Sequence, residues 1–164
     1  MDFRAALLDQ TRAFGDLIRG ADPTTPVPTC PDWTLKQLFR HVGRGNRWAA
    51  QIIVEQRQSA LDPRDVRDGR PPDDEDGAIE WLQEGAQLII DAVDRVGSAT
   101  RVWTFRGPRP AGWWIRRRLH EVEVHRADAA LALGASYGPA AELAADAISE
   151  WIELHASNTS RPAL

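Results

Sequence analysis

Three ionisable side chains lie on one face of a predicted helix in the last third of the sequence. The segment GWWIRRRLHEVEVHRADAALALG, residues 112–134, has helical periodicity. An advance of about 100° per residue places Glu121, His125 and Asp128 beside Trp114, on the side expected to face the core. Buried carboxylates without partners are costly in free energy, so these groups need partners or a metal ion.

Glu121 and His125 are four residues apart, so both side chains project from one helix face and can bind the same ion. A carboxylate oxygen and an imidazole nitrogen suit Zn²⁺, with Ni²⁺ or Fe²⁺ as alternatives. Such pairs also occur as solvated ion pairs, or as buried salt bridges with an arginine, and the spacing alone leaves these alternatives open. Two ligands do not complete a site, so a third should come from another helix.

A second predicted helix supplies a candidate for that third ligand. His41 lies at the flank of its apolar side, in a row with Gly45, Trp48 and Ile52. A glycine inside a helix costs about 1 kcal/mol relative to alanine, so Gly45 indicates that something bulky, a ligand or a neighbouring backbone, approaches there. The alternative for His41 is a core histidine bonded to a backbone carbonyl.

The hypothesis is a metal site of three ligands, His41, Glu121 and His125, with coordination positions left for water or a thiolate. Asp128 is expected behind these ligands, where it would orient an imidazole. Cys30 lies in a proline-rich segment before the His41 helix and is a possible nucleophile, but no base lies at a fixed sequence distance from it.

Three consecutive arginines, Arg116 to Arg118, cannot all project from one side of a helix. They are interpreted either as long side chains that reach the bundle surface or as a clamp for substrate carboxylates at the mouth of the site.

Composition limits the classes of protein to consider. The 164 residues carry a net charge of −4, which argues against a nucleic-acid-binding protein. The single cysteine excludes an intramolecular disulfide and a CxxC metal site. No apolar run is long enough for a membrane span, and the charged N-terminus is not a signal peptide, so we expect a cytoplasmic protein. Lys36 is the single lysine among 20 basic residues, an arginine bias typical of a high-GC bacterium.

Helical periodicity runs through most of the chain and predicts an all-α four-helix bundle with an additional helix or long crossover loops. The bundle is expected over residues 1–157, with a tail at 158–164. Residues 102–105 have the composition of a strand, but no partner strand is evident. The expected helices are residues 2–20, 34–61, 77–96, 112–133 and 139–155.

Helical wheels also predict which sides of the helices face solvent. On the helix that carries Glu121, the solvent side should have His120 at its edge and should be formed by Arg116, Glu123, Arg126, Ala127 and Ala130. Val124 and Leu131 should flank the buried side of that helix. Arg47 should lie on the polar side of the His41 helix.

Three segments resemble a known family. VPTCPDWTLKQLFRHVG (27–43) and RRLHEVEVHRADA (117–129) resemble the two signatures of the mycothiol-dependent maleylpyruvate isomerase family, within the DinB-like superfamily. YGPAAELAADAISEWI (137–152) is similar to the family's last bundle helix. The resemblance implies a helical bundle that binds a divalent metal, usually zinc, and its ligands fall on His41, Glu121 and His125.

The resemblance also implies chemistry. Family members use the thiol mycothiol, which actinobacteria make, as a cosubstrate. A metal-bound thiolate would attack an electrophilic small molecule, in an isomerase or an S-transferase reaction. Trp48 and Trp114 would line the pocket, and Arg117 would hold a substrate carboxylate. The alternative is a non-catalytic metal-binding bundle with a regulatory or interaction role.

Two expectations concern assembly. Family isomerases carry a second, C-terminal domain, whereas this sequence ends after the predicted bundle. Two expectations fit that difference: a truncated chain, or a single-domain relative with another substrate. A homodimer is expected, because single bundles of this size often pair through apolar faces.

Overall fold

The computed structural model describes residues 1–156, which form five α-helices and one small hairpin. The predicted all-α bundle with an additional helix is confirmed, and four of the five helices begin and end within two residues of the predicted positions. The predicted tail, 158–164, lies outside the described residues. The elements are α1 (Phe3–Ile18), α2 (Leu35–Val54), a 3₁₀ turn (Pro63–Asp65), α3 (Glu75–Val96), β1 (Arg101–Val102), β2 (Arg109–Pro110), α4 (Trp113–Leu133) and α5 (Ala141–Ala156).

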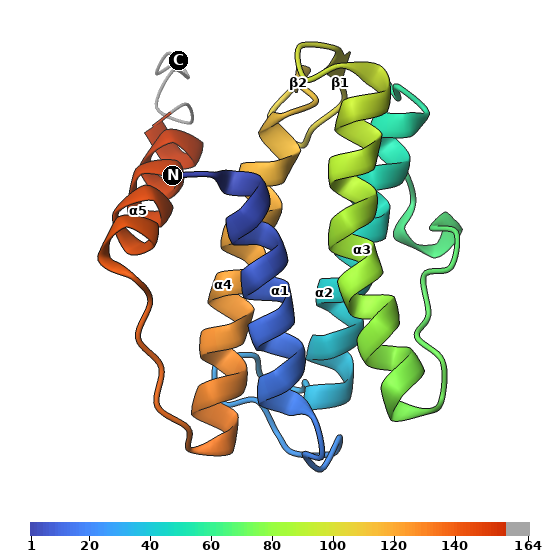
Figure 1. Ribbon diagram of the computed structural model, residues 1–164. Helices are drawn as coiled ribbons and strands as arrows, with labels where there is room; N and C mark the ends of the chain where they lie inside the picture. The colour runs from blue at the N-terminus through green and yellow to red at the C-terminus, as the bar shows by residue number, and fades with distance from the viewer. Residues whose placement is uncertain (157–164) are drawn as a thin grey trace, which may run out of the picture.

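Helices α1 to α4 form the bundle, and α5 lies outside it, beside α4 (Figure 1). Helices α1 and α2 each pack against both α3 and α4. Helices α2 and α3 run in the same direction, so the segment 55–74 crosses the length of the bundle between them (Figure 1). Because α2 and α4 are neighbours, side chains from these two helices can meet although they are far apart in sequence.

The apolar faces of the four bundle helices enclose one core. Phe14 from α1, Leu38 from α2, Leu82 from α3 and Leu119 from α4 are fully buried in it. Local signals place the helix ends: Asp74 caps α3 through the Gly77 amide, and α4 ends at Gly134, whose φ of 63° favours glycine. No helix within residues 1–156 combines the length and the apolar character needed to cross a membrane.

The predicted helix 34–61 is wrong at its C-terminal end, because α2 ends at Val54 and Gln56 takes a positive φ of 46°. The chain turns back there, and the Trp48 indole donates a hydrogen bond to the Leu61 carbonyl at 2.8 Å. In a continuous helix these two residues would be about 20 Å apart along the axis. A tertiary contact therefore ends the helix earlier than its periodicity indicates.

The prediction that residues 102–105 have no partner strand is also wrong. Arg101 and Val102 of β1 pair antiparallel with Pro110 and Arg109 of β2. The partner lies in the same irregular stretch, and Gly107 turns the chain between the two strands with a φ of 82°. This hairpin lies at the end of the bundle where α4 begins (Figure 1).

Several predicted exposures on α4 are wrong. His120, Glu123 and Ala130 are buried, because α4 packs against α1 and α2 and is also covered by α5 and the segment before it. Val124 and Leu131, expected beside the buried face, are instead 53% and 60% exposed. A wheel assumes a single buried side, and α4 has neighbours on several sides.

Arg47 of α2 is likewise buried and not on a polar surface. Its guanidinium lies over the Trp81 ring, 4.6 Å from the ring centroid, and donates a hydrogen bond to the Trp81 carbonyl. It also bonds Glu84 at 3.2 Å. Burial lowers the pKa of Arg47, and contacts from α3 compensate the desolvation of the charge.

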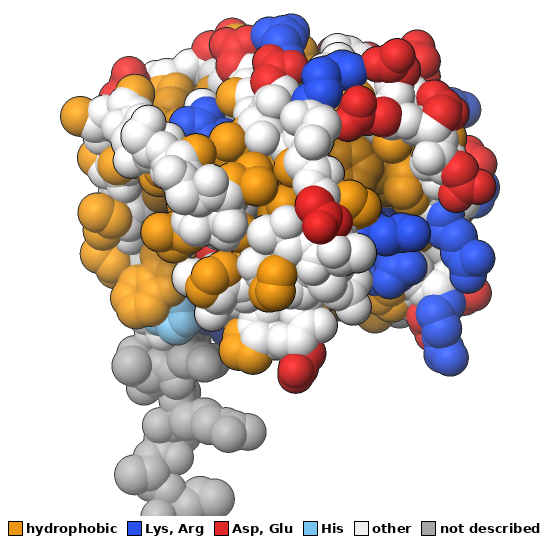
Figure 2. Space-filling model, turned by 90° about the horizontal axis from the view of Figure 1, so that it is seen from below, with side chains coloured by type: hydrophobic (Ala, Val, Ile, Leu, Met, Phe, Trp, Pro, Cys, Tyr) orange, Lys and Arg blue, Asp and Glu red, His pale blue; other side chains and the backbone are white. Residues whose placement is uncertain are grey.

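A cavity of about 400 Å³ opens at the end of the bundle where α1 ends and α2 and α3 begin. Figure 2 shows the molecule from this end: acidic and basic side chains gather along the top and right of the view, and hydrophobic side chains lie in the centre and on the left. Both charge signs line the cavity, Lys36 and Arg40 from α2 and Asp74 and Glu75 at the start of α3. None of the predicted site residues lines it.

Candidate metal centre

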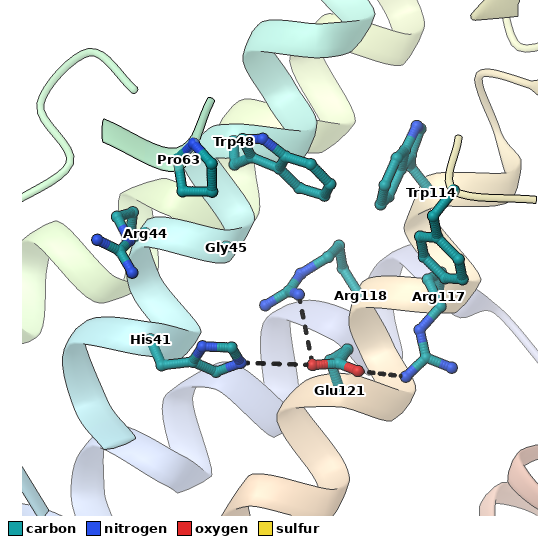
Figure 3. A pocket seen from close by; sticks show the side chains of 10 residues that line it. His41, Arg44, Gly45, Trp48, Pro63, Trp114, Arg117, Arg118 and Glu121 are labelled. Atoms are coloured by element: carbon teal, nitrogen blue, oxygen red, sulfur yellow. Dashed lines mark hydrogen bonds and ion pairs between the residues drawn. The ribbon is translucent and has the colours of Figure 1, made fainter. Parts of the chain in front are cut away.

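The packing of α2 against α4 brings together the three predicted ligands. His41 projects from α2 toward Glu121 and His125, which lie one turn apart on the facing side of α4. Figure 3 shows His41 and Glu121 pointing toward each other across this interface. The Trp33 ring packs against the His41 ring, with 4.9 Å between centroids, and limits its rotation.

The distances fit a single cation. Glu121 Oε2 lies 3.7 Å from His41 Nε2 and 3.6 Å from His125 Nε2. One ligand atom from each of the three residues lies within 4.8 Å of the other two. Two atoms that each bind Zn²⁺ at about 2.1 Å can be no more than about 4.2 Å apart, so the two measured separations suit a shared ion. Two imidazoles and a carboxylate also suit zinc, nickel or iron.

Glu121 is held by arginines as well as histidines. Arg117 Nη2 donates to Glu121 Oε1 at 2.8 Å, and Arg118 Nη1 lies 3.6 Å from Oε2 (Figure 3). Burial by itself would raise the pKa of Glu121, but the two histidines and two arginines around it outweigh burial and hold that pKa well below its usual range. Glu121 is therefore ionised, as a metal ligand must be.

Asp128 lies against the imidazole ring of His125. Nδ1 of that ring lies 2.8 Å from Asp128 Oδ2, and a carboxylate only accepts hydrogen bonds, so the ring proton lies on Nδ1 and Nε2 is left as the ligand atom. Burial opposes protonation of His125, but the two carboxylates raise its pKa overall. Thr29 Oγ1 donates to the other oxygen of Asp128 at 2.6 Å, which fixes the carboxylate in turn.

Cys30 contacts this arrangement without lying among the three ligands. Its Sγ is 3.7 Å from Asp128 Oδ2, and Cys30, His125 and Asp128 also place potential ligand atoms close together. Burial and the negative charge of Asp128 raise the pKa of the Cys30 thiol. A raised pKa disfavours the thiolate, so this environment does not activate Cys30 as a nucleophile.

Gly45 accommodates the bulky group that its position predicts, and that group is the Arg118 guanidinium. A Cβ atom at Gly45 would lie 2.6 Å from Arg118 Nη2. Arg118 is fully desolvated, which lowers its pKa to about 10, and it donates to Asn46 Oδ1 at 2.9 Å and to the Val42 carbonyl at 3.2 Å. The glycine thus lets a permanent positive charge lie between α2 and Glu121.

A cavity of about 250 Å³ opens beside His41 and Glu121, which are the two candidate ligands that line it (Figure 3). Trp48 and Trp114 form one wall, at 5.3 Å between centroids and nearly perpendicular to each other. Phe105 and Pro63 complete the apolar lining. Arg44 also lines the cavity and forms no ion pair with the described residues, so it is available to an anionic ligand.

The three consecutive arginines have different surroundings. Arg117 and Arg118 line the cavity beside Glu121 and contact that carboxylate of the protein itself, so a role in holding a substrate carboxylate stays a prediction. Arg116 instead joins α4 to α5 through Asp146 and Glu153. The wheels did not identify Arg44, Asn46 or Phe105 as cavity or support residues. Among these features, only the interior glycine at position 45 gave a sequence indication. It predicted the close approach of another group, but not that the group is the Arg118 side chain.

Comparison with known families gives one match. The model of the mycothiol maleylpyruvate isomerase N-terminal domain matches residues 4–130, which include α1 to α3 and most of α4. No curated protein and no solved structure matches the chain. The matched region contains all three candidate ligands and ends before α5.

Proposed function

We propose, because the chain belongs to the mycothiol maleylpyruvate isomerase N-terminal domain family, that its DinB-like bundle is a metal-dependent enzyme domain. It would bind a divalent cation, with zinc favoured over nickel or iron, through His41, Glu121 and His125. Its reaction would use a low-molecular-weight thiol of the mycothiol type against an electrophilic small molecule. The observation that carries the proposal is the convergence of two imidazole nitrogens on one carboxylate oxygen, at 3.7 and 3.6 Å.

A bound divalent cation would lower the pKa of a coordinated thiol, so that the thiolate is available near neutral pH. The residues of the chain support that chemistry. Asp128 binds His125 at Nδ1, so that Nε2 is the nitrogen that faces Glu121 and the cation. Arg117 and Arg118 keep Glu121 ionised. The raised pKa of Cys30 supports a thiol from outside the chain as the nucleophile.

The cavity would hold the electrophile. Trp48 and Trp114 offer flat apolar surfaces to an unsaturated or aromatic group. Arg44 can donate paired hydrogen bonds to a carboxylate of the substrate. Arg117, the predicted carboxylate ligand, adds positive charge beside the cavity, but its two terminal nitrogens already donate to Glu121 and Glu150. This combination suits a small, unsaturated organic anion better than a neutral or cationic molecule.

Two reaction types suit such a site. In an isomerase, the sulfur adds to a conjugated double bond, rotation follows about the resulting single bond, and loss of the same thiol restores the double bond in the trans form. In an S-transferase, the new carbon–sulfur bond persists and a leaving group departs, or an epoxide opens and takes up a proton. An increase in thioether product identifies the second type, and an unchanged thiol concentration identifies the first.

Elemental analysis and turnover test the proposal together. Purified protein should contain about one equivalent of a divalent metal, His41→Ala should contain far less, and the control His155→Ala should match the wild type, because His155 stacks on Trp151 away from the cluster. Mycothiol with a panel of unsaturated acids and epoxides should give metal-dependent turnover. Absence of metal from the wild type contradicts the proposal, and metal without thiol-dependent turnover favours the non-catalytic alternative.

The remaining expectations about assembly and location stay predictions. A homodimer is expected, and light scattering on the purified protein measures its mass directly. A cytoplasmic location in a mycothiol-producing actinobacterium also stays a prediction, and so does the absence of a nucleic-acid partner.

A further inference from the structure

Helix α5 contributes a buried acid to the metal centre although it lies outside the region that matches the family. Only two residues of α5 are buried, Leu143 and Glu150. Glu150 is 3% exposed, and its position near the middle of a surface helix is unusual for a carboxylate. A buried carboxylate is costly unless it is paired, so its partner identifies its role.

That partner is Arg117, which contacts two carboxylates at once. Its Nη1 donates to Glu150 Oε2, and its Nη2 donates to Glu121 Oε1 at 2.8 Å. The Arg117 side chain is itself only 12% exposed. One guanidinium therefore joins an acid on α5 to the candidate metal ligand on α4.

This link determines which oxygen of Glu121 is available. Oε1 is taken by Arg117, whereas Oε2 faces His41 and His125. Arginine favours a bidentate fork on a single carboxylate. Without Glu150, Arg117 would be free to turn both terminal nitrogens onto Glu121 and to compete with a cation for Oε2.

We infer that Glu150 is a positioning residue for the metal centre, which holds Arg117 on Glu121 Oε1 and leaves Oε2 for the cation. The inference rests on the proposed function, because it concerns the affinity of the same metal site. It also assigns a role to α5, which makes further polar contacts with Arg116 and His120 of α4.

Glu150 does not look like a group placed for stability alone. Its Oε1 is buried and has no hydrogen-bond partner among the described residues. Burial raises the pKa of Glu150, against the opposing effect of Arg117. A neutral amide at this position removes the charge that holds Arg117, while its oxygen can still accept a hydrogen bond from that guanidinium, so the fold should be kept while the hold on Arg117 is loosened.

The test compares Zn²⁺ affinities, measured by competition with a chromophoric chelator at fixed pH. Glu150→Gln should weaken Zn²⁺ binding by about 10-fold, the lower end of the range for residues that orient ligands. Its melting temperature without metal should stay close to that of the wild type, because an amide oxygen at position 150 can still accept from Arg117. The matched control is Glu153→Gln, the same change on the same helix, at a carboxylate that pairs with Arg116 at 2.8 Å. Its affinity should stay that of the wild type.

A double-mutant cycle separates action through Arg117 from other effects. In an Arg117→Gln background, Glu150→Gln should cause no further change in Zn²⁺ affinity. Equal affinities of wild type and Glu150→Gln overturn the inference, and so does an equal loss in Glu153→Gln or a loss that persists in the Arg117→Gln background. A wild type that binds no Zn²⁺ overturns the proposed metal site and this inference with it.

Discussion

Helix α4 carries two clusters of histidine and carboxylate side chains, and they use their imidazole nitrogens differently. In the α4–α5 cluster, formed by His120, Glu123 and Asp146, His120 Nδ1 lies 3.2 Å from Glu123 and Nε2 lies 2.7 Å from Asp146. Both ring nitrogens are thus within hydrogen-bond distance of a carboxylate, and the His120 side chain is 3% exposed.

In the α2–α4 cluster, formed by His41, Glu121 and His125, the nitrogen–oxygen separations are 3.7 and 3.6 Å. These exceed ordinary hydrogen bonds and suit atoms that share an ion. This cluster also lies beside a cavity, and the His41 side chain is 37% exposed. The same residue types therefore form a structural contact on one face of α4 and a candidate binding site on the other, and distance and access distinguish them.

The largest expected difference between the clusters is the response to metal. Zn²⁺ at 1,000 times its dissociation constant should raise the free energy of unfolding of the wild type by about 4 kcal/mol. His125→Ala should lose this increment, because it removes a ligand atom. Chemical denaturation with and without Zn²⁺ measures both values. An increment that persists in His125→Ala would show that the metal binds elsewhere.

The α4–α5 cluster should respond in the opposite way. His120→Ala should lower the free energy of unfolding by about 2 kcal/mol, because it leaves the buried carboxylate of Glu123 without its imidazole partner. Its Zn²⁺ affinity should equal that of the wild type. Urea denaturation and chelator competition measure the two quantities, and a parallel loss of affinity would mean that the clusters are not independent.

A smaller effect is expected from the residue behind His125. Asp128→Asn should weaken Zn²⁺ binding by about 10-fold, because the ring of His125 loses the carboxylate that orients it. Cys30→Ser is the control, since Cys30 contacts the same carboxylate at 3.7 Å without contacting the other ligands. Equal Zn²⁺ affinities of Asp128→Asn and the wild type would show that Asp128 does not contribute to metal binding.

The smallest effect concerns pH and the α4–α5 cluster. Burial alone would raise the pKa of Asp146, but hydrogen bonds from Arg116 and His120 lower it below its ordinary value of 3.8. The stabilisation is therefore present above pH 3.8 and is lost as the pH falls below it. Metal-free Asp146→Asn should show a shallower acid destabilisation than the wild type in thermal melts. Equal slopes would place the acid sensitivity in other carboxylates.

Local spacing was sufficient to predict the part of the site that lies on one helix. Glu121, His125 and Asp128 lie on one face at intervals of three and four residues, and the structure gives them a common neighbourhood. Gly45 signalled a close approach because an interior helix glycine needs a reason. The position of His41 on the apolar flank of its helix was sufficient to predict it as the third ligand, without the packing of α2 against α4.

Tertiary partners decided what the sequence could not predict. Arg47 is buried because α3 offers it the Trp81 ring and carbonyl, and α2 stops at Val54 so that Leu61 can reach Trp48. Glu150 lies 33 residues after Arg117 on another helix, and no periodicity relates the two. Each of these features depends on which elements become neighbours, which a helical wheel does not contain.

Trp48 and Trp114, which line the cavity, belong to a larger group of tryptophans with distinctive optical properties. Trp48, Trp103, Trp113 and Trp114 form a chain of nearly perpendicular rings with 5.1 to 5.6 Å between the centroids of successive neighbours. Indoles this close exchange excitation energy, so the group absorbs and emits as a coupled set. Trp151, 60% exposed on α5, lies outside the group and should emit at longer wavelength. The protein therefore carries an intrinsic reporter whose near-ultraviolet circular dichroism should change when a molecule enters the cavity.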